Sequence, residues 1–473
     1  MEYRPAMRRA VRDCSERGLY EASKWVAEFL LIYPTDRNRN RVSDLDDLIS
    51  TPPMSRATPV GSGSGTGSFN TTSGSTADTN MSSGDPGPST QAYHASGFFT
   101  APIDLASMGI REEEPMTDEE SDLFMIARAL YDAKEHERVA YLLRATAHPK
   151  AKFLGLYSRF IASEKNAHDV WMSRKEVKPD PRKQDSKPAA PVNEELSDIL
   201  TQTEGSSDPF ILFLRAILLK NMLLKAEAIE AAVLSLQAYP WNWSCWKLLW
   251  EIVDDHDVIE RMRPLLPPAS HPLTRIFLIG VMIESHAMTP ELEEDLDGLV
   301  AMFPHSLHIR TLQAHYAYSI RDYDLSLEMF TSMRSVDPYR IDEVDTHSNI
   351  LYTMKKQADL SQLAQHFMSV NRDRPEVSLV IGNYYSLRNE HEKAVRYYQR
   401  AVQLHPTYGA AWTLMGHEFL EMKNSHAAIE AYRRGIDINK KDYRAWHGLG
   451  QAYELLDMPQ YALHYFQRST ALR

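Results

Sequence analysis

The sequence has almost no cysteine and no long apolar run. Cys14 and Cys245 are the only two thiols in 473 residues and have no CxxC spacing, which excludes a disulfide framework and a thiol-rich zinc site. The most apolar run, FILFLRAILL, contains Arg215 and is too short to span a bilayer, and the N-terminus has no apolar signal core. We expect a soluble protein in a reducing, intracellular compartment.

An excess of positive charge is also absent. The net charge is −12, with 43% hydrophobic and 25% charged residues, which is typical of a globular protein with a sizeable core. This balance argues against a protein that coats nucleic acid or an anionic membrane. We therefore expect protein partners, with no nucleic acid and no membrane.

Motifs that carry catalysis are missing as well. The glycine-rich tract 61–67 lacks the GK[ST] ending of a phosphate-binding loop, and the motifs HExxH, GxSxG, HRD and DFG do not occur. The histidines are scattered without acidic or thiol companions at metal-ligand spacing. The acidic run REEEPMTDEESD (111–122) is interpreted as the charged start of a helix rather than a calcium site. The sequence predicts no enzyme, no cofactor and no metal.

What the sequence does contain is an apolar pattern at helical spacing that returns every 34 residues. Ser378, Trp412 and Trp446 align at this interval. It is the period of tetratricopeptide (TPR) repeats, in which antiparallel helix pairs stack into a superhelix. The predicted fold is therefore an all-α TPR superhelix, an α-solenoid. The residues expected to pack the repeats are Gly382, Tyr385, Ala394, Tyr398, Pro406, Trp412, Gly416, Ala428, Tyr432, Trp446, Gly450, Tyr453, Ala462 and Phe466.

This spacing has a physical reason. Two antiparallel helices approach closely only where side chains are small, so Gly382 and Ala394 are expected to mark a near contact, with Tyr385 and Tyr398 beside it. Pro406 is expected to end the second helix, because proline cannot donate a helical hydrogen bond. One hairpin leaves an apolar face open, and the next hairpin covers that face.

Two segments of biased composition interrupt the helical pattern. One is rich in Ser, Thr, Gly and Pro, and the other is charged and proline-rich. Neither buries enough apolar area to offset the entropy of ordering it. The predicted organisation is an N-terminal helical hairpin (1–33), a disordered insert (34–117), TPR-like helices (118–164), a charged Pro-rich linker (165–206), degenerate TPR units (207–304) and a regular TPR array (305–473).

A polar series follows the small position on the first helix of each unit. His315, Asn349, Asn383, His417 and Gln451 recur every 34 residues. In TPR arrays this position faces the concave groove, where side chains with donors and acceptors grip an extended peptide backbone. The alternative is that these groups bond within their own hairpins. The candidate peptide-binding groove comprises His315, Asn349, Asn383, Thr413, His417, Arg444, His447 and Gln451.

Some segments are more specific than the repeat pattern, namely DCSERGLYEASKWVAEFL, KFLGLYSRFIASEK, IGNYYSLRNEHEKA, AWTLMGHEFLEMKNSHAAIEAYRRGID and KDYRAWHGLGQAYELL. They resemble the subunit-eight (cell-division-cycle twenty-three type) family of the anaphase-promoting complex. The resemblance implies a non-catalytic scaffold of a ubiquitin ligase of the cell cycle, in the nucleus and cytoplasm. It also implies a homodimer through the units before Pro240, contacts with other TPR and platform subunits, and a coactivator motif held in the C-terminal groove.

Two other readings stay open. The chain is alternatively a generic TPR adaptor for another complex, either a transferase auxiliary or a chaperone adaptor. A clamp for a chaperone's terminal carboxylate needs Lys or Arg on the first helices, where Glu376, Leu379 and Val380 stand instead. Chains of the resembled family continue with more repeats, so we expect a C-terminus cut short at Arg473, with the last hairpin uncovered.

Overall fold

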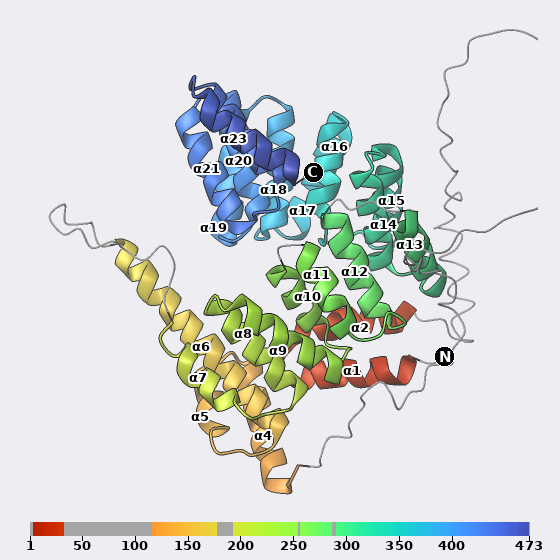
Figure 1. The fold of residues 1–473 in the computed structure, drawn as a ribbon, viewed down its shortest axis with the longest axis vertical. Coiled ribbons are helices and arrows are strands. Elements are labelled where there is room, and N and C mark those ends of the chain that lie inside the picture. The colour runs from red at the N-terminus through yellow and green to blue at the C-terminus, as the bar shows by residue number, and fades with distance from the viewer. Residues whose placement is uncertain (1–2, 33–115, 177–192, 254–255, 286–289, 473) are drawn as a thin grey trace, which may run out of the picture. The chain divides into compact units, whose positions relative to one another are not determined.

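The computed structural model describes residues 3–32, 116–176, 193–253, 256–285 and 290–472. All of them belong to one compact unit, made of Met1–Leu48 and Asp104–Arg473, and the second unit, Ile49–Ile103, lies outside the described ranges. Within those ranges the regular structure is helical and no strand occurs (Figure 1). None of the described helices has the length and apolarity needed to cross a membrane. The predicted all-α fold is confirmed.

The first part of the described chain contains α1 (Arg4–Glu16), α2 (Tyr20–Ile32), α4 (Asp118–Asp132), α5 (His136–Leu142), α6 (Pro149–Glu176) and α7 (Leu196–Thr203). The middle contains α8 (Pro209–Asn221), α9 (Lys225–Ala238), α10 (Trp243–Ile252), α11 (His256–Met262), the 3-10 turn η2 (Arg263–Leu265), α12 (Pro272–Glu284) and α13 (Pro290–Met302).

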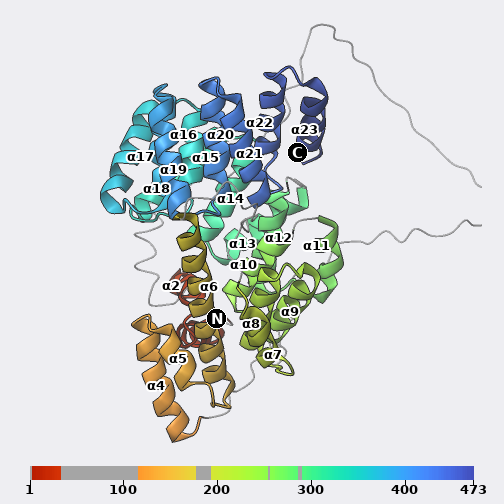
Figure 2. The ribbon, with the colours of Figure 1, turned by 90° about the vertical axis from the view of Figure 1, so that its left-hand side faces the viewer.

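The C-terminal array consists of successive helix pairs that lie side by side (Figure 2). They are α14 (Leu307–Ser319), α15 (Tyr323–Val336), α16 (Val344–Thr353), α17 (Gln357–Val370), α18 (Pro375–Leu387), α19 (His391–Leu404), α20 (Gly409–Glu421), α21 (Ser425–Ile438), α22 (Tyr443–Glu454) and α23 (Pro459–Ala471). As expected, α19 ends two residues before Pro406.

The glycines of the array make room for aromatic rings. A Cβ atom placed on Gly382 would lie 2.3 Å from a ring carbon of Tyr398, and one on Gly416 would lie 2.5 Å from the ring of Tyr432. Both distances are shorter than carbon atoms can approach, so only glycine fits there. The Tyr398 ring thus lies directly over Gly382, and Ala394 is buried on the second helix.

The turn inside each pair uses one residue in the left-handed region of backbone space. In the described pairs these residues are Gly18, Lys134, Leu223, Arg321, Lys355, Asn389, Lys423 and Asp457. The next N–H bonds back to a carbonyl five residues earlier, as in the 2.8 Å bond from Asn424 N to Phe419 O. This Schellman-type bond satisfies carbonyls that the end of the first helix leaves unpaired.

The predicted linker 165–206 is too long at both ends. Helix α6 continues to Glu176, because residues 165–176 contain neither proline nor glycine and nothing in them stops the helix. Helix α7 forms within the predicted linker because Leu196, Ile199 and Thr203 share one face and are buried. The acidic run forms a helix start as interpreted, with the Thr117 hydroxyl accepting from the N–H of Glu120 at 3.3 Å. The insert 34–117 lies almost wholly outside the described residues.

Helix α1 packs against the pair α8–α9, which lies far from it in sequence. The hydroxyl of Tyr239 donates to the carboxylate of Asp13 at 2.9 Å, across 226 residues of sequence. The guanidinium of Arg17 lies 4.0 Å from the centre of the Phe210 ring. Tyr239 follows α9 and Phe210 begins α8, so α1 contacts the connection between consecutive units.

Helix α2 makes aromatic contacts with later turns. The Trp25 indole stacks on Trp243 with ring centres 3.9 Å apart, and its edge meets His308 at 5.2 Å. Phe29 meets the ring of Phe303 at 5.3 Å. The hairpin α1–α2 thus bridges several inter-unit turns, and we call it the brace.

Candidate functional site: a polar ladder on the first helices

The predicted ladder occupies equivalent places on five first helices. His315 lies on α14, Asn349 on α16, Asn383 on α18, His417 on α20 and Gln451 on α22. Their surroundings differ, although their spacing is the same. Asn383 is buried, His315, Asn349 and His417 are half-buried, and Gln451 is exposed. The ladder therefore has inner rungs and an exposed rung.

Asn383 is the most enclosed rung, with 2% of its surface exposed. Its amide nitrogen donates to the hydroxyl of Ser348 and to the side-chain oxygen of Asn349, both at 2.9 Å. Its own oxygen accepts from the hydroxyl of Tyr398 at 2.7 Å. Two of these bonds reach the preceding pair and one stays within its own hairpin, so the amide is engaged inside the stack and Asn383 does not offer these groups to a peptide.

His417 repeats part of this arrangement one unit later. Its Nδ1 shares a 2.7 Å hydrogen bond with the hydroxyl of Tyr432, which is the residue equivalent to Tyr398. Burial, with Arg444 adding to it, lowers the pKa of His417 to about 4. The imidazole is therefore neutral at physiological pH.

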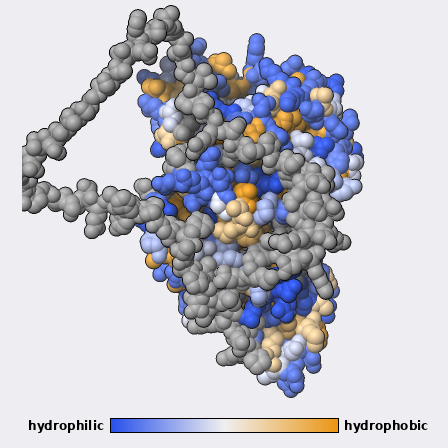
Figure 3. All heavy atoms as spheres, turned by 90° about the vertical axis from the view of Figure 1, so that its right-hand side faces the viewer, coloured by the Kyte–Doolittle hydropathy of each residue, from blue (hydrophilic) through white to orange (hydrophobic). Residues whose placement is uncertain are grey.

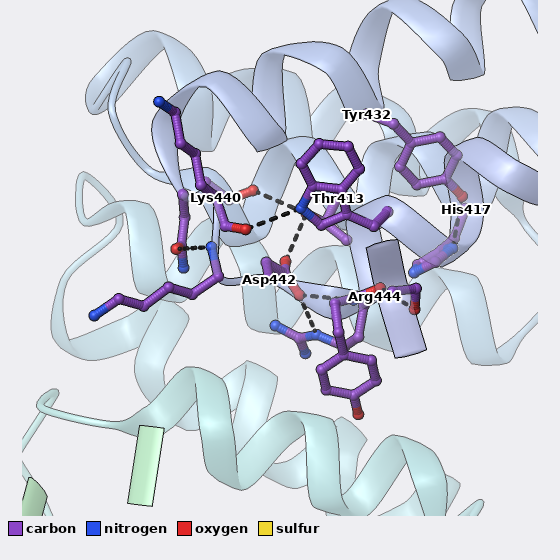
Figure 4. Close-up of polar contacts among 12 residues, drawn as sticks. Thr413, His417, Tyr432, Lys440, Asp442 and Arg444 are labelled. Atoms are coloured by element: carbon purple, nitrogen blue, oxygen red, sulfur yellow. Dashed lines mark hydrogen bonds and ion pairs between the residues drawn. The ribbon is translucent and has the colours of Figure 1, made fainter. Parts of the chain in front are cut away.

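Asp442 joins two of the predicted groove residues, and the sequence analysis did not name it. Figure 4 shows its carboxylate between Thr413, which donates at 2.9 Å, and Arg444, whose Nε donates at 3.0 Å. Burial works against the carboxylate, but the charge and hydrogen bonds of Arg444 hold the pKa of Asp442 below its usual value. The pair fixes the Arg444 side chain at the start of α22, next to the exposed His447.

A second charged group lies around His315. Its Nε2 is 2.9 Å from the carboxylate of Glu343, a residue in the left-handed region at the start of α16. Burial opposes a charged imidazole, but Glu343 outweighs it and raises the pKa of His315. The same pairing lowers the pKa of Glu343 against the effect of burial. The protonated imidazole and the carboxylate form an ion pair.

Another carboxylate shows how tightly the first helices converge. The Tyr408 hydroxyl donates to Asp345 at 2.6 Å, although one whole unit lies between them in sequence. Burial and the neighbouring Glu343 charge raise the pKa of Asp345. Just before α22, the ammonium of Lys441 donates to the carbonyl of Val253, which follows α10, at 2.6 Å. The starts of α16, α20 and α22 thus make polar contacts outside their own pairs. We call the surface that carries Thr413, Asp442, Arg444, His447 and Gln451 the ladder face.

One buried acid on α20 was missed. Glu418 has a side chain only 6% exposed and accepts from Ser386 at 2.6 Å, while its other oxygen lies 2.8 Å from Nδ1 of His391. The units before and after have Tyr384 and Ala452 at this repeat position. A carboxylate where neighbouring repeats have apolar groups was the signal that could have found it.

The described residues offer little to a metal or a nucleophilic mechanism. No group of three or more His, Cys, Asp or Glu in this part of the chain is arranged to hold a metal ion. Burial raises the pKa of both thiols, Cys14 and Cys245, to about 12, so neither is a thiolate near neutral pH. What the site can do chemically is form hydrogen bonds and ion pairs.

Comparison with known proteins follows this geometry. A family model described as anaphase promoting complex subunit 8 / Cdc23 matches residues 2–314, which is more than half of the chain. The chain belongs to this family. A tetratricopeptide-repeat model matches residues 333–473. The family resemblance and the repeat class inferred from the sequence are both confirmed.

Relatives in distant organisms carry the same family name. Anaphase-promoting complex subunit 8 of Arabidopsis thaliana is 34% identical over 90% of this chain and 66% of its own length. Anaphase-promoting complex subunit CDC23 of Saccharomyces cerevisiae is 32% identical over 67% of this chain and 59% of its own length. The human cell division cycle protein 23 homolog is 38% identical over 54% of this chain and 42% of its own length. The chain thus spans about two fifths to two thirds of these relatives.

Solved structures show the same fold. The structure titled as an APC/C hetero-tetramer of Cut9 and Hcn1 matches with a TM-score of 0.52, covering 75% of this chain and 73% of that one. Its sequence identity is 15%, so the likeness concerns the arrangement of helices alone.

Proposed function

We propose that this chain is a non-catalytic scaffold subunit of an anaphase-promoting complex. It homodimerises through its N-terminal units, contacts other TPR and platform subunits, and holds a coactivator motif on the ladder face. Family membership supports the complex, and the fixed polar face of the C-terminal array supports peptide binding. The nucleus and cytoplasm are the compartments in which such a subunit acts.

The observation that carries the peptide proposal is the fixed Thr413–Asp442–Arg444 arrangement beside exposed polar residues. Arg444 is held by Asp442 with its side chain still 39% exposed. His447 and Gln451 are exposed on the same helix. A peptide gains affinity from groups that are already oriented, because it does not have to order them. The inner rungs, led by Asn383, then act as support for this outer edge.

Binding of a synthetic coactivator-motif peptide to the full chain, measured by fluorescence anisotropy, tests the proposal. His447→Ala combined with Gln451→Ala is expected to raise the Kd about tenfold, a loss of about 1.4 kcal/mol. The matched control is Gln403→Ala with Gln467→Ala, two exposed residues on second helices. Equal affinity for both double variants would contradict the peptide site.

The homodimer proposal is supported by apolar residues on α4. Met125 is 60% and Ile126 54% exposed, and Tyr141 on α5 is exposed as well. Figure 3 shows hydrophobic residues within a mostly hydrophilic face, including the lower end where Figure 1 places α4. Exposed apolar groups of this kind are typical of protein interfaces.

Light scattering of the purified chain tests the dimer. Met125→Asp with Ile126→Asp is expected to give monomers, since each copy then buries two charges in the interface. Leu404→Asp, at an exposed leucine of the array, is the control and leaves the dimer intact. A monomeric parent chain would refute the homodimer.

The chaperone-adaptor alternative receives no support at the clamp positions. Leu379 and Val380 are completely buried, so neither they nor basic residues placed there would reach a peptide. A chaperone C-terminal peptide in the same anisotropy assay is expected not to bind, and tight binding would favour the adaptor over the ligase subunit.

A further inference from the structure

The start of α22 contacts a helix that lies far from it in sequence. The ammonium of Lys441 donates to the carbonyl of Val253 at 2.6 Å, and 188 residues separate the two. Val253 is the C-cap of α10 and is buried. The last carbonyls of a helix have no partner within it and lie at the negative end of its dipole, where a cation is favourable. Lys441 therefore caps α10 from a pair near the end of the described chain.

Glu284, which ends α12, and Tyr318, in the last turn of α14, lie near the start of α22. Surrounding protein raises the pKa of Glu284 by desolvation although this residue is exposed, and the charge of Lys441 partly offsets the rise. Burial likewise raises the pKa of Tyr318, and the charge of Arg444 works against it. A side chain that is both accessible and desolvated lines a recess. The ends of α12 and α14 thus form a wall of this recess that faces Lys441 and Arg444.

The groups that meet across this recess are polar, unlike those that hold neighbouring pairs together. Lys441 and Glu284 are charged, and Tyr318 carries a hydroxyl. Between the last two pairs, by contrast, the buried side chains of Ile436 and Leu449 belong to one apolar core. Separating apolar residues exposes them to water, whereas water replaces the partners of charged groups at little cost. The contact at Lys441 can therefore open while the pairs on either side of it stay folded.

We propose that Lys441 is a clasp that closes the wall of α12 and α14 over the ladder face, so that a peptide enters and leaves this face only when the clasp opens. Asp442 and Arg444 follow Lys441 within three residues, so the clasp and the ladder face share the start of α22. A gate of this kind slows association and dissociation together and changes the affinity little. The inference rests on the peptide-binding function proposed above and adds how access to that site is controlled.

Electron–electron resonance distances between two spin labels test the clasp without a peptide. The labels are attached through Ser285→Cys, after α12, and Asp437→Cys, on α21; both positions are exposed, and the two native thiols are buried. The parent chain is expected to give one narrow distance distribution, and Lys441→Met is expected to broaden it toward longer distances. Lys440→Met, at the exposed neighbouring lysine, is the matched control and leaves the distribution unchanged. A broad distribution in the parent chain, or equally narrow ones in both lysine variants, would overturn the clasp.

Stopped-flow fluorescence with the synthetic coactivator-motif peptide and the full chain tests the gate. In Lys441→Met the association and dissociation rate constants are both expected to rise about fivefold, while Kd changes by less than about twofold. Lys440→Met is expected to match the parent chain. Unchanged rate constants would overturn the gate. So would a weaker Kd with an unchanged association rate constant, because Lys441 would then contact the peptide directly.

Lys441→Arg separates the charged donor from the rest of the side chain. A guanidinium keeps the charge and donates to a carbonyl, so this variant is expected to retain the narrow distances and the slow rate constants of the parent chain. Arginine that behaves like methionine would count against a clasp made by a charged donor. A parent chain that binds no peptide would refute the proposed peptide site together with its gate, whereas the distances would still decide whether α22 is clasped to α10.

Discussion

The brace and the C-terminal array are held together in different ways. In the last three pairs of the array, the first helix receives the aromatic ring of its partner at a glycine: Gly382 with Tyr398, Gly416 with Tyr432 and Gly450 with Phe466. Around the brace each contact is unique, as in the stack of Trp25 on Trp243. Packing within the pairs thus follows from a glycine and an aromatic residue that recur along the sequence. The packing of the brace against later helices depends instead on single contacts between distant residues.

Removing the central ring of the brace is expected to have the largest effect. Trp25→Ala deletes an indole that stacks on Trp243 and meets His308, and it is expected to cost about 3 kcal/mol of local unfolding free energy. Hydrogen exchange of α1 and α2 measures this cost, and protection of α18 to α23 is expected to stay unchanged. Trp446→Ala, at a half-buried array tryptophan, is the control and affects only its own pair. Uniform loss of protection along the chain would erase the distinction between the two regions.

A methyl group at an array glycine is expected to have the next largest effect. Gly382→Ala places an atom inside contact distance of the buried Tyr398 ring and is expected to cost about 2–3 kcal/mol. Urea unfolding followed by circular dichroism measures the loss. Gly298→Ala, on α13, is the control because its Cβ would meet no atom within 4 Å. Similar stability of the two variants would show that the array does not depend on its glycine–aromatic contacts.

Two histidines of α14 are expected to respond to pH in opposite directions: His308, which contacts the brace, and His315, which is paired with Glu343. Burial, aided by Arg340, lowers the pKa of His308 to about 4, so protonation favours the unfolded state, whose histidine titrates near 6.5. His308 therefore contributes stability that is lost as pH falls from about 6.5 through 4, amounting to about 2 kcal/mol at pH 5. His315, with a raised pKa, contributes stability below about 6.5 that is lost as pH rises through its folded value.

Hydrogen exchange at pH 5, 7 and 8 follows both responses. The brace is expected to open more easily at pH 5, and this dependence is expected to shrink in His308→Gln. The α14–α16 region is expected to weaken toward pH 8 and to lose that trend in His315→Gln. The same direction of change in both regions would refute the assignment of one neutral and one paired histidine.

The smallest effect is expected inside the ladder. Asn383→Ala leaves the buried hydroxyl of Tyr398 without its acceptor and is expected to cost about 1–2 kcal/mol. Gln451→Ala, at the exposed rung, is expected to change stability by less than about 0.5 kcal/mol. Thermal unfolding compares them, and equal values would mean that inner and outer rungs do not differ.

The repeating part of the fold was predictable because its rule is local. Gly382, Tyr398 and Pro406 recur at fixed intervals, so helix pairs, their order and their ends followed from spacing. The polar register of His315 to Gln451 was predictable for the same reason. Which rungs are buried was not, because burial depends on contacts with neighbouring pairs, such as those of Asn383 with Ser348 and Asn349. Asn383 and Gln451 have the same repeat position and opposite exposure.

The brace was beyond sequence reasoning, and the acidic contacts do not follow from the repeat spacing. Asp13 and Tyr239 are separated by 226 residues of sequence. Nothing in the spacing of Trp25 or Asp13 indicates partners so far along the chain. Glu418 and Asp442 each occur once and are not repeated at the 34-residue interval. An alignment based on that interval therefore does not mark them.

The long reach of the brace has a consequence for biosynthesis. Asp13 leaves the ribosome 226 residues before Tyr239, a delay of about 10–45 seconds at ordinary translation rates. During that interval Trp25 and Phe29 lack the rings of Trp243 and Phe303 that they meet in the folded protein, so a nascent-chain chaperone has time to bind the first hairpin. Maturation of this protein is therefore expected to depend on the speed of translation through its middle third.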